Sequence, residues 1–187
     1  MKLFLVGFMG CGKTTLGKHL ASKLKYDFID FDALFENRFR ISITDFFLKY
    51  GESHFRKIES QMLKEAEYYD RTVFSTGGGT ACFFDNMEWM NREGITIYVK
   101  MSAETLHSRL LKSKLKRPLI ANLTNDELKI YIENQLKQRK VFYTMASLTI
   151  DGFNPKIDEI VNAVMARCRR ISNHLLLNRH TFSTCCV

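Results

Sequence analysis

The feature that most constrains this chain is a glycine-rich segment close to its start. Residues 3–6 (LFLV) form an apolar run of strand length, and residues 7–14 (GFMGCGKT) then match the pattern G-x-x-x-x-G-K-[ST]. Glycines let the backbone turn tightly, so that successive N–H groups can point inward at an anion. A helix beginning near Lys13 would add the positive end of its dipole. The segment therefore predicts a loop that binds the phosphates of a nucleoside triphosphate.

The residue types within this loop indicate separate roles. Lys13 would reach the β- and γ-phosphates, and the Thr14 hydroxyl would take one place around Mg²⁺. The alternative is a plain glycine turn between a strand and a helix. That interpretation leaves unexplained why Lys13 and Thr14 both stand at the required offsets after Gly12. Cys11 occupies a variable position, where we expect a small residue that fills the loop rather than a reactive thiolate.

The chain's length and charge narrow the classes of partner. Its 187 residues suit one domain with a real core, and 28 Lys plus Arg against 20 Asp plus Glu give a net charge of +8. Part of this excess is local, because arginines follow Glu159, the last acidic residue. A modestly basic protein suits anionic small substrates. The sequence shows no arginine-rich face with interleaved aromatic residues, the pattern that would favour nucleic-acid binding. We expect small-molecule partners, no nucleic acid, and a monomer.

The cysteines and the start of the chain bear on its location. Five cysteines form no C-x-x-C pair and no zinc-like spacing with histidine, which favours free thiols in a reducing compartment. The apolar start resembles a signal peptide, and Cys11 a lipoprotein cysteine, but cleavage there would destroy the phosphate loop. No segment approaches the roughly 18 apolar residues of a membrane span. We expect a cytoplasmic protein with no membrane segment.

Short apolar runs alternate with longer helical patterns, which predicts β-α units around a parallel sheet. Strands are expected at residues 3–6, 28–31, 72–75, 95–100 and 148–150. Helices are expected at residues 13–24, 84–92, 103–111, 125–144 and 156–165. From Ala33 to Tyr69, apolar residues recur at helical spacing, so we expect a helical excursion there.

Two segments fall outside this alternation. Basic residues between Lys112 and Asn125 precede Pro118, which stops a helix and leaves the segment solvated. Residues 171–187 have no clear place in the plan, and we expect them to be poorly ordered.

Polar groups follow two further strands, and ligands of open parallel sheets bind beyond the carboxyl ends of strands. In an extended segment, Asp30 and Asp32 would lie on the same side, one toward a metal and the other toward a substrate hydroxyl. Either could instead cap a helix before Ala33. Residues 77–79 form a triple glycine that exposes backbone N–H groups to a closely approaching substrate, although a plain turn is equally allowed.

Arg56 precedes Glu59 by three residues, so the two side chains can pair across one helical turn. A surface salt bridge is the alternative to a functional role, and by itself the more ordinary one.

These segments, in this order and spacing, resemble the shikimate kinase family from Lys2 to about Arg167. The resemblance rests on GFMGCGKTT, FIDFD, ISITDFFLKYGESHFRKIE, STGGG, RPLI and a late NP. It implies an α/β fold of the P-loop NTPase type, with three α/β/α layers, a five-stranded parallel sheet, a helical substrate-binding part and a mobile lid. We accordingly expect a domain over residues 1–170, with the substrate-binding part at about 33–62 and the lid at about 112–125.

The resemblance also implies the activity. Shikimate kinases transfer the γ-phosphoryl group of ATP to the 3-hydroxyl of shikimate, with Mg²⁺, in the chorismate route to aromatic amino acids. Carried over by position, Asp32 contacts the shikimate hydroxyls and is the candidate base. Arg56 and Arg139 grip the carboxylate, with Glu59 orienting Arg56. The remaining acceptor-site residues are Gly78 and Gly79, which lend backbone, and an apolar wall of Ile43, Phe47 and Phe55.

On the nucleotide side, the resemblance makes Lys13, Asp32 and Arg117 the catalytic set and places Thr14 and Asp30 toward the magnesium. Arg117 matches the lid arginine that reaches over the phosphates, beside Pro118 and Leu119. Arg109 matches the arginine that stacks on adenine. ATP would be bound by Gly10, Cys11, Gly12, Lys13, Thr14, Thr15, Arg109, Arg117 and Pro155.

Two rival functions stay open at this point. Another small-molecule kinase of the same fold, acting on gluconate or a nucleoside monophosphate, would share the loop and the sheet. A nucleotide-binding regulator without chemistry would share them too. Turnover with a panel of acceptors separates all three.

Overall fold

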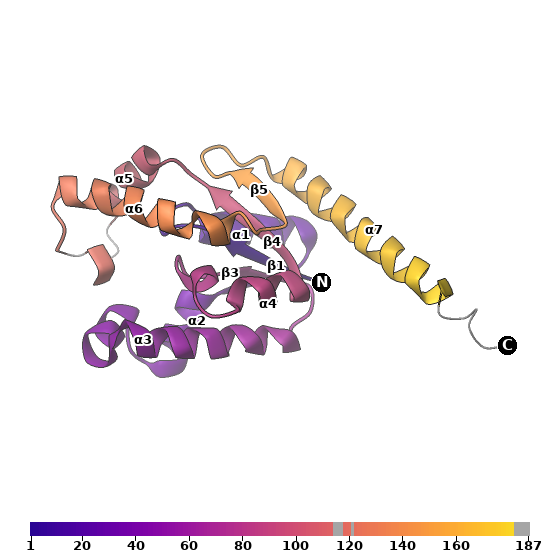
Figure 1. Ribbon diagram of the computed structural model, residues 1–187, viewed down its shortest axis with the longest axis horizontal. Coiled ribbons are helices and arrows are strands. Elements are labelled where there is room, and N and C mark those ends of the chain that lie inside the picture. The colour runs from indigo at the N-terminus through magenta and orange to yellow at the C-terminus, as the bar shows by residue number, and fades with distance from the viewer. Residues whose placement is uncertain (114–117, 121, 182–187) are drawn as a thin grey trace. The chain divides into compact units, whose positions relative to one another are not determined.

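The computed structural model describes residues 1–113, 118–120 and 122–181 (Figure 1). The chain divides into two compact units, residues 1–155 and 156–187. The first unit contains the sheet and all the candidate site residues that the structure describes.

The centre of the first unit is a five-stranded sheet in which every pair of neighbouring strands is parallel. The strand order is β2-β3-β1-β4-β5, so β1, which leads into the phosphate loop, is the central strand. Leu3 pairs with Val73 on one side and with Ile95 on the other. The strands are β1 (Lys2–Val6), β2 (Asp27–Asp30), β3 (Thr72–Ser75), β4 (Gly94–Lys100) and β5 (Leu148–Asp151).

In the described residues, seven α-helices connect and follow these strands. They are α1 (Lys13–Leu24), α2 (Phe31–Phe39), α3 (Ile43–Lys64), α4 (Asn86–Glu93), α5 (Ala103–Lys112), α6 (Asn125–Tyr143) and α7 (Ile157–Thr181). Short 3-10 segments lie at Glu65–Tyr68, Thr80–Cys82 and Pro118–Ile120. The three-layer α/β/α fold expected from the sequence is confirmed. No helix in the described part of the chain is long and apolar enough to cross a membrane.

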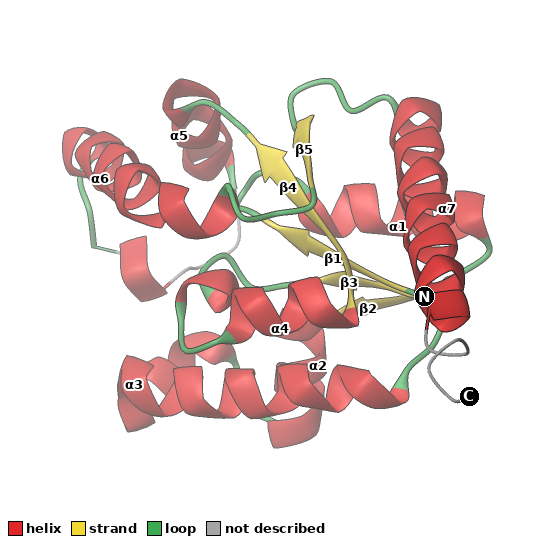
Figure 2. Cartoon of the chain, turned by 45° about the vertical axis from the view of Figure 1, so that its right-hand side comes forward, coloured by secondary structure: helices red, strands yellow, loops and turns green. Residues whose placement is uncertain are grey.

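Alternate residues of β1 face opposite layers of helices. Phe4 belongs to a buried cluster that includes Trp89 of α4, and their rings meet edge to face with centroids 6.0 Å apart. Leu5 faces α1, because a Cβ added to Gly17 would lie 3.1 Å from its side chain. Figure 2 shows α1 and α4 on opposite sides of the sheet. Burial of both faces explains why β1 is a continuous apolar run rather than an alternating one.

A second, smaller core holds α2 against α3. Phe35, Phe46, Phe55 and Met62 are buried together, and the rings of Phe35 and Phe46 meet at an angle of 88° with centroids 5.0 Å apart. The helical excursion predicted from the 33–69 spacing is therefore two helices with a core of their own. Within α3 the helix is broken at Gly51, whose φ of 78° is readily adopted only by glycine.

The last helix differs from the sequence-based prediction. The expected helix over residues 156–165 ends too early, because α7 continues to Thr181. The structure thus includes residues 171–181 in a helix that the sequence-based plan did not contain, while residues 182–187 lie outside the described residues. No glycine or proline occurs between Lys156 and Val187, so the chain contains no strong helix breaker there.

Candidate active site

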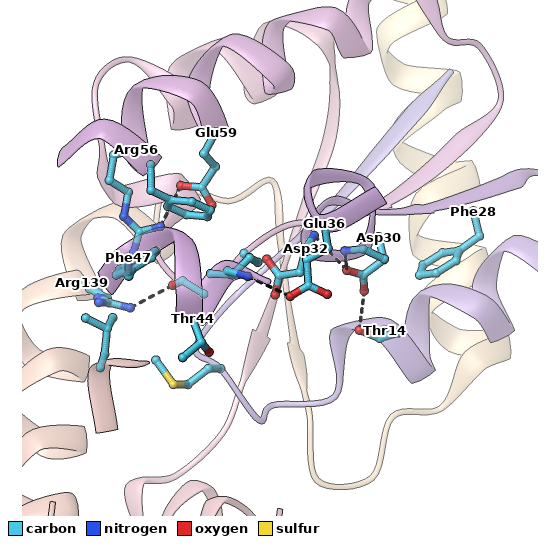
Figure 3. A pocket seen from close by; sticks show the side chains of 18 of the residues that line it. Thr14, Phe28, Asp30, Asp32, Glu36, Thr44, Phe47, Arg56, Glu59 and Arg139 are labelled. Carbon is cyan, nitrogen blue, oxygen red and sulfur yellow. Dashed lines mark hydrogen bonds and ion pairs between the residues drawn. The ribbon is translucent and has the colours of Figure 1, made fainter. Parts of the chain in front are cut away.

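The carboxyl ends of β1, β2 and β3 open onto one cavity of about 610 Å³. Its walls come from the phosphate loop, the start of α2, α3 as far as Glu59, the triple glycine and α6. Figure 3 shows Arg56 and Arg139 at one end of the cavity, Thr14 and Asp30 at the other, and Asp32 between them. Cationic groups that can hold a carboxylate thus face the nucleotide loop across one space.

The phosphate loop has the backbone that the motif predicts. Gly10 and Gly12 have φ values of 83° and 96°, and α1 begins at Lys13. The ammonium group of Lys13 is buried and donates hydrogen bonds to the carbonyl oxygens of Gly7 and Phe8, at 2.8 and 3.0 Å. This arrangement holds one positive charge over the loop, at the N-terminus of a helix, where an anion is doubly favoured.

Cys11 is only 1% exposed, and its sulfur lies 3.8 Å from the Lys13 nitrogen. A thiol so enclosed is screened from reagents, which fits its expected role as a small filler of the loop. The plain-turn interpretation of this segment does not account for the buried lysine.

Thr14 and Asp30 meet at the mouth of the loop. The Thr14 hydroxyl donates to a carboxylate oxygen of Asp30 at 2.6 Å and lies 3.5 Å from the Ser75 hydroxyl. Among the described residues no group of three or more His, Cys, Asp and Glu could hold a metal ion by itself. Mg²⁺ bound with nucleotides usually takes only one or two protein oxygens and completes its shell with phosphates and water. A hydroxyl and a carboxylate together fit that requirement.

The segment carrying the two aspartates is not extended throughout, contrary to the sequence-based expectation. Asp30 ends β2 and caps α2, accepting hydrogen bonds from the backbone of Asp32 and Ala33. Asp32 therefore lies in the first helical turn and is exposed at the cavity wall. The capping role belongs to Asp30, because a carboxylate one residue before the helix can reach the free N–H groups of its first turn.

Arg56 is the most tightly held cation of the cavity wall. Its side chain is 6% exposed and pairs with Glu59, 5% exposed, at 2.8 Å. Glu52 accepts from its Nε and a terminal nitrogen at 3.1 and 3.0 Å. Burial disfavours the charged guanidinium, but Glu59 and Glu52 outweigh it and raise the pKa of Arg56 above its ordinary value. The predicted pairing of Arg56 with Glu59 is confirmed, and the surface-bridge alternative is wrong.

Gly79 and three aromatic rings fix the guanidinium plane. A Cβ at Gly79 would lie 2.8 Å from a terminal nitrogen of Arg56 and 3.0 Å from its central carbon. The rings of Phe83, Phe55 and Phe47 lie 4.6, 5.2 and 5.9 Å from that carbon. A side chain at residue 79 would therefore force the guanidinium of Arg56 to shift. Phe47, Phe55 and Ile43 also line the cavity, as the apolar wall expected from the sequence.

A series of buried hydrogen bonds fixes the position of the Glu59 carboxylate. The Thr80 hydroxyl donates to the second oxygen of Glu59 at 2.5 Å, and the carbonyl of Thr80 accepts from the Asn86 amide at 2.8 Å. Ser60 in turn donates to Asn86 at 2.6 Å. These groups connect α3 with the loop after β3 and with α4, so Glu59 has little freedom to turn away from Arg56.

Arg139 reaches the triple glycine from α6. It is 7% exposed and donates from a terminal nitrogen to the carbonyl oxygen of Gly78 at 3.0 Å. Its guanidinium also lies 5.4 Å from the centre of the Phe8 ring, in the phosphate loop. Sequence segments 61 residues apart are thereby joined at the cavity wall.

For the other residues expected to bind the nucleotide, the structure gives only their surroundings or exposure. A Cβ at Gly12 would lie 3.5 Å from a terminal nitrogen of Arg109, so Arg109 lies beside the phosphate loop. Thr15 is exposed in the first turn of α1, and Pro155 is half-buried after β5. Arg117 lies outside the described residues, together with most of the basic part of the expected lid. Leu119, in the described part of that segment, lines the cavity.

Several residues with roles at this site were not singled out from the sequence; they include Thr80 and Phe83, which contact the Arg56–Glu59 pair, and also Glu52 and Tyr143. Glu52 stands four residues before Arg56, and Tyr143 four residues after Arg139, so each shares a helix face with its arginine. This i, i+4 spacing is the signal that could have found them. This signal is weak, because most i, i+4 pairs on helices are ordinary surface contacts.

Comparisons with known proteins agree with this geometry. Residues 9–169 match a family model described as "Shikimate kinase". A shikimate kinase of Azobacteroides pseudotrichonymphae is 43% identical over 167 residues, which cover 89% of this chain and 98% of that protein.

Two solved structures are similar over most of their length. A crystal structure of shikimate kinase from Bacteroides thetaiotaomicron superposes with a TM-score of 0.79 at 38% identity, covering 92% of this chain and 98% of that one. The shikimate kinase of Acinetobacter baumannii in complex with shikimate also gives 0.79, at 32% identity, covering 89% and 93% of the two chains.

Proposed function

This chain belongs to the shikimate kinase family, and we propose that it transfers the γ-phosphoryl group of ATP to the 3-hydroxyl of shikimate. The observation that carries the proposal is the shared cavity, in which two buried arginines face a phosphate loop across an aspartate. Shikimate is a rigid ring with one carboxylate and three hydroxyls. Shikimate therefore suits a site that binds an anion at one end and presents an alcohol to a phosphate at the other.

Arg56 and Arg139 hold the shikimate carboxylate in this proposal. Planar guanidinium groups make paired, charge-assisted hydrogen bonds to carboxylates, and Glu59 keeps Arg56 oriented. Backbone of the Gly78–Gly79 segment adds contacts, while Ile43, Phe47 and Phe55 pack on the ring. These groups fix the acceptor before the chemical step, which is the larger part of what an enzyme contributes to phosphoryl transfer.

Asp32 acts on the reacting hydroxyl. The oxygen of that hydroxyl bonds to the γ-phosphorus, the bond from phosphorus to the leaving oxygen of ADP breaks, and the hydroxyl proton passes to the Asp32 carboxylate. Lys13 stays beside the phosphates and neutralises the charge that shifts toward ADP. Asp32 is exposed at the cavity wall, so its carboxylate is accessible to a bound alcohol.

The nucleotide is bound by Gly10, Cys11, Gly12, Lys13, Thr14 and Thr15 of the phosphate loop and α1, with Arg109 and Pro155 near adenine. Arg117 is assigned to the phosphates by its place in the sequence alone. We assign the substrate-binding part to residues 33–62, the lid to 112–125 and the whole kinase domain to 1–170. A monomer in the cytoplasm completes the proposal.

Mg²⁺ fits the same site. Thr14 and Asp30 would hold it, directly or through water, since their oxygens lie 2.6 Å apart at the mouth of the phosphate loop. When bound, the ion would help to neutralise the charge of the triphosphate. Chelation with EDTA should remove activity, and added Mg²⁺ should restore it.

The decisive experiment is an acceptor panel. Purified protein is incubated with ATP and Mg²⁺ and with shikimate, gluconate or AMP, and ADP release is followed by a coupled assay. We expect turnover with shikimate at least a hundredfold above the other acceptors. Turnover of gluconate or AMP with none of shikimate would contradict the proposal. Shikimate binding by calorimetry without ADP release would favour the regulator.

A further inference from the structure

Two donors from α6 converge on one backbone oxygen at the cavity wall. The phenol of Tyr143 donates to the Gly78 carbonyl at 2.6 Å, and Arg139 donates to the same oxygen at 3.0 Å. A carbonyl oxygen has two lone pairs, so both are engaged by protein groups. The Gly78 carbonyl therefore serves the protein itself, and the ligand-facing groups of this segment must be others.

The Tyr143 side chain is packed in the hydrophobic core and does not line the cavity. It is 1% exposed, and its ring stacks on Tyr98 of β4 with centroids 5.0 Å apart and planes 22° apart. Burial raises the pKa of its phenol above the ordinary range, although Arg139 opposes this. The phenol is thus a neutral donor at a fixed place throughout the working range of pH.

The hydrogen bond from Tyr143 to the Gly78 carbonyl orients two groups, the Gly79 N–H and the Arg139 guanidinium. The peptide between Gly78 and Gly79 is trans and planar, so a carbonyl directed at Tyr143 turns the Gly79 N–H to the opposite edge. Arg139 donates a hydrogen bond to the same carbonyl oxygen of Gly78, so the position of that oxygen also determines the direction of one hydrogen bond of the Arg139 guanidinium. Arg139 and Gly79 both line the cavity.

We propose that Tyr143 is a positioning residue for the acceptor: by holding the Gly78 carbonyl, it aligns Arg139 and the Gly78–Gly79 peptide for the carboxylate of the substrate. The inference rests on the proposed function, since it concerns binding of that acceptor. It assigns Tyr143 no contact with substrate and no part in the transfer of the phosphoryl group.

The test is Tyr143→Phe, which removes one hydroxyl and keeps the ring. Losing one neutral hydrogen bond should raise the KM for shikimate, and its Kd by calorimetry, roughly three- to tenfold. The KM for ATP and kcat should stay within about twofold. The matched control is Tyr98→Phe, which removes a hydroxyl from the partner ring and leaves Gly78 untouched. Its shikimate KM should equal that of wild type.

A merely structural role for Tyr143 predicts other results. An unchanged shikimate KM with a lowered melting temperature would overturn the inference, as would equal rises in the KM values for shikimate and ATP. Failure of the wild type to turn over shikimate would instead contradict the proposed function.

A double-mutant cycle with Arg139→Ala tests the route of the effect. If Tyr143 acts through Arg139, the combined loss in kcat/KM for shikimate should be smaller than the product of the single losses. Strictly multiplicative losses would overturn the claim that Tyr143 aligns Arg139.

Discussion

Arg56 and Glu59, one helical turn apart on α3, form an ion pair of 2.8 Å in which both side chains are about 95% buried. Removing one partner of such a pair leaves an uncompensated buried charge, which is far more costly than losing an exposed pair. Glu59 is itself held by Thr80, so the guanidinium is oriented before any ligand arrives. Arg56→Lys and Gly79→Ala test what this preorganisation does.

Arg56→Lys should be damaging although it conserves the charge. Lysine cannot reproduce the planar set of donors that meets Glu52 and Glu59 and would meet a carboxylate. We expect kcat/KM for shikimate to fall roughly ten- to a hundredfold, with ATP affinity unchanged in the absence of shikimate. The matched control is Arg38→Lys, since Arg38 makes a two-point pair with Glu65 but is 43% exposed. Wild-type behaviour of Arg56→Lys would return Arg56 to a structural role.

Gly79→Ala tests the close approach of backbone and guanidinium. The φ of Gly79 is −107°, which alanine adopts freely, so any loss arises from contact and not from backbone strain. The new Cβ would lie 2.8 Å from Arg56, which is clamped by two glutamates and must shift. The KM for shikimate should rise at least about tenfold, while the KM for ATP moves less than about twofold. A normal shikimate KM would show that Arg56 can yield without cost.

Lys13→Met should nearly abolish turnover, with kcat lowered by roughly a thousandfold or more, because the ammonium lies where β- and γ-phosphate charge is redistributed. Shikimate binding without nucleotide, measured by calorimetry, should persist and shows that the variant is folded. Activity near that of wild type would refute the assignment of the loop.

Asp32→Asn should lower kcat by roughly two to four orders of magnitude and leave ATP binding intact, since the amide keeps the shape but cannot take the proton. Asp45→Asn is the control, because Asp45 lies in the first turn of α3 as Asp32 lies in that of α2, but does not line the cavity. An unchanged kcat for Asp32→Asn would leave this aspartate as part of the helix start only.

Stability at high pH should report on Tyr143. Burial raises the folded-state pKa of its phenol, with Cys82 and Cys11 adding to the rise and Arg139 opposing it. The neutral phenol therefore stabilises the fold below the unfolded pKa of about 10, and this contribution is lost as pH rises, by about 1.4 kcal/mol per unit. Between pH 10 and 11 the melting temperature of wild type should fall more steeply than that of Tyr143→Phe. Parallel curves would contradict this.

Much of the fold could be predicted from local pattern. The bounds of α1 and β3 are those expected from the sequence, because each is marked by a nearby signal: the glycine loop before Lys13, and the glycines after Ser75. At β2 the predicted strand, 28–31, was shifted by one residue from the observed Asp27–Asp30. Asp30 turns the chain into α2 at Phe31, and a capping carboxylate is hard to distinguish from a strand end in the sequence.

By itself, then, the sequence determined the phosphate loop, the alternation of strands and helices, and the pairing of Arg56 with Glu59, all of which depend on spacings of a few residues. Only the tertiary structure decided that this pair is buried, that Gly79 lies against the guanidinium, and that Arg139 and Tyr143 share the Gly78 carbonyl. These last contacts join residues 61 and 65 positions apart. Such groups meet because α6 packs against the segment that follows β3, and that packing depends on the burial of the whole core rather than on any local pattern.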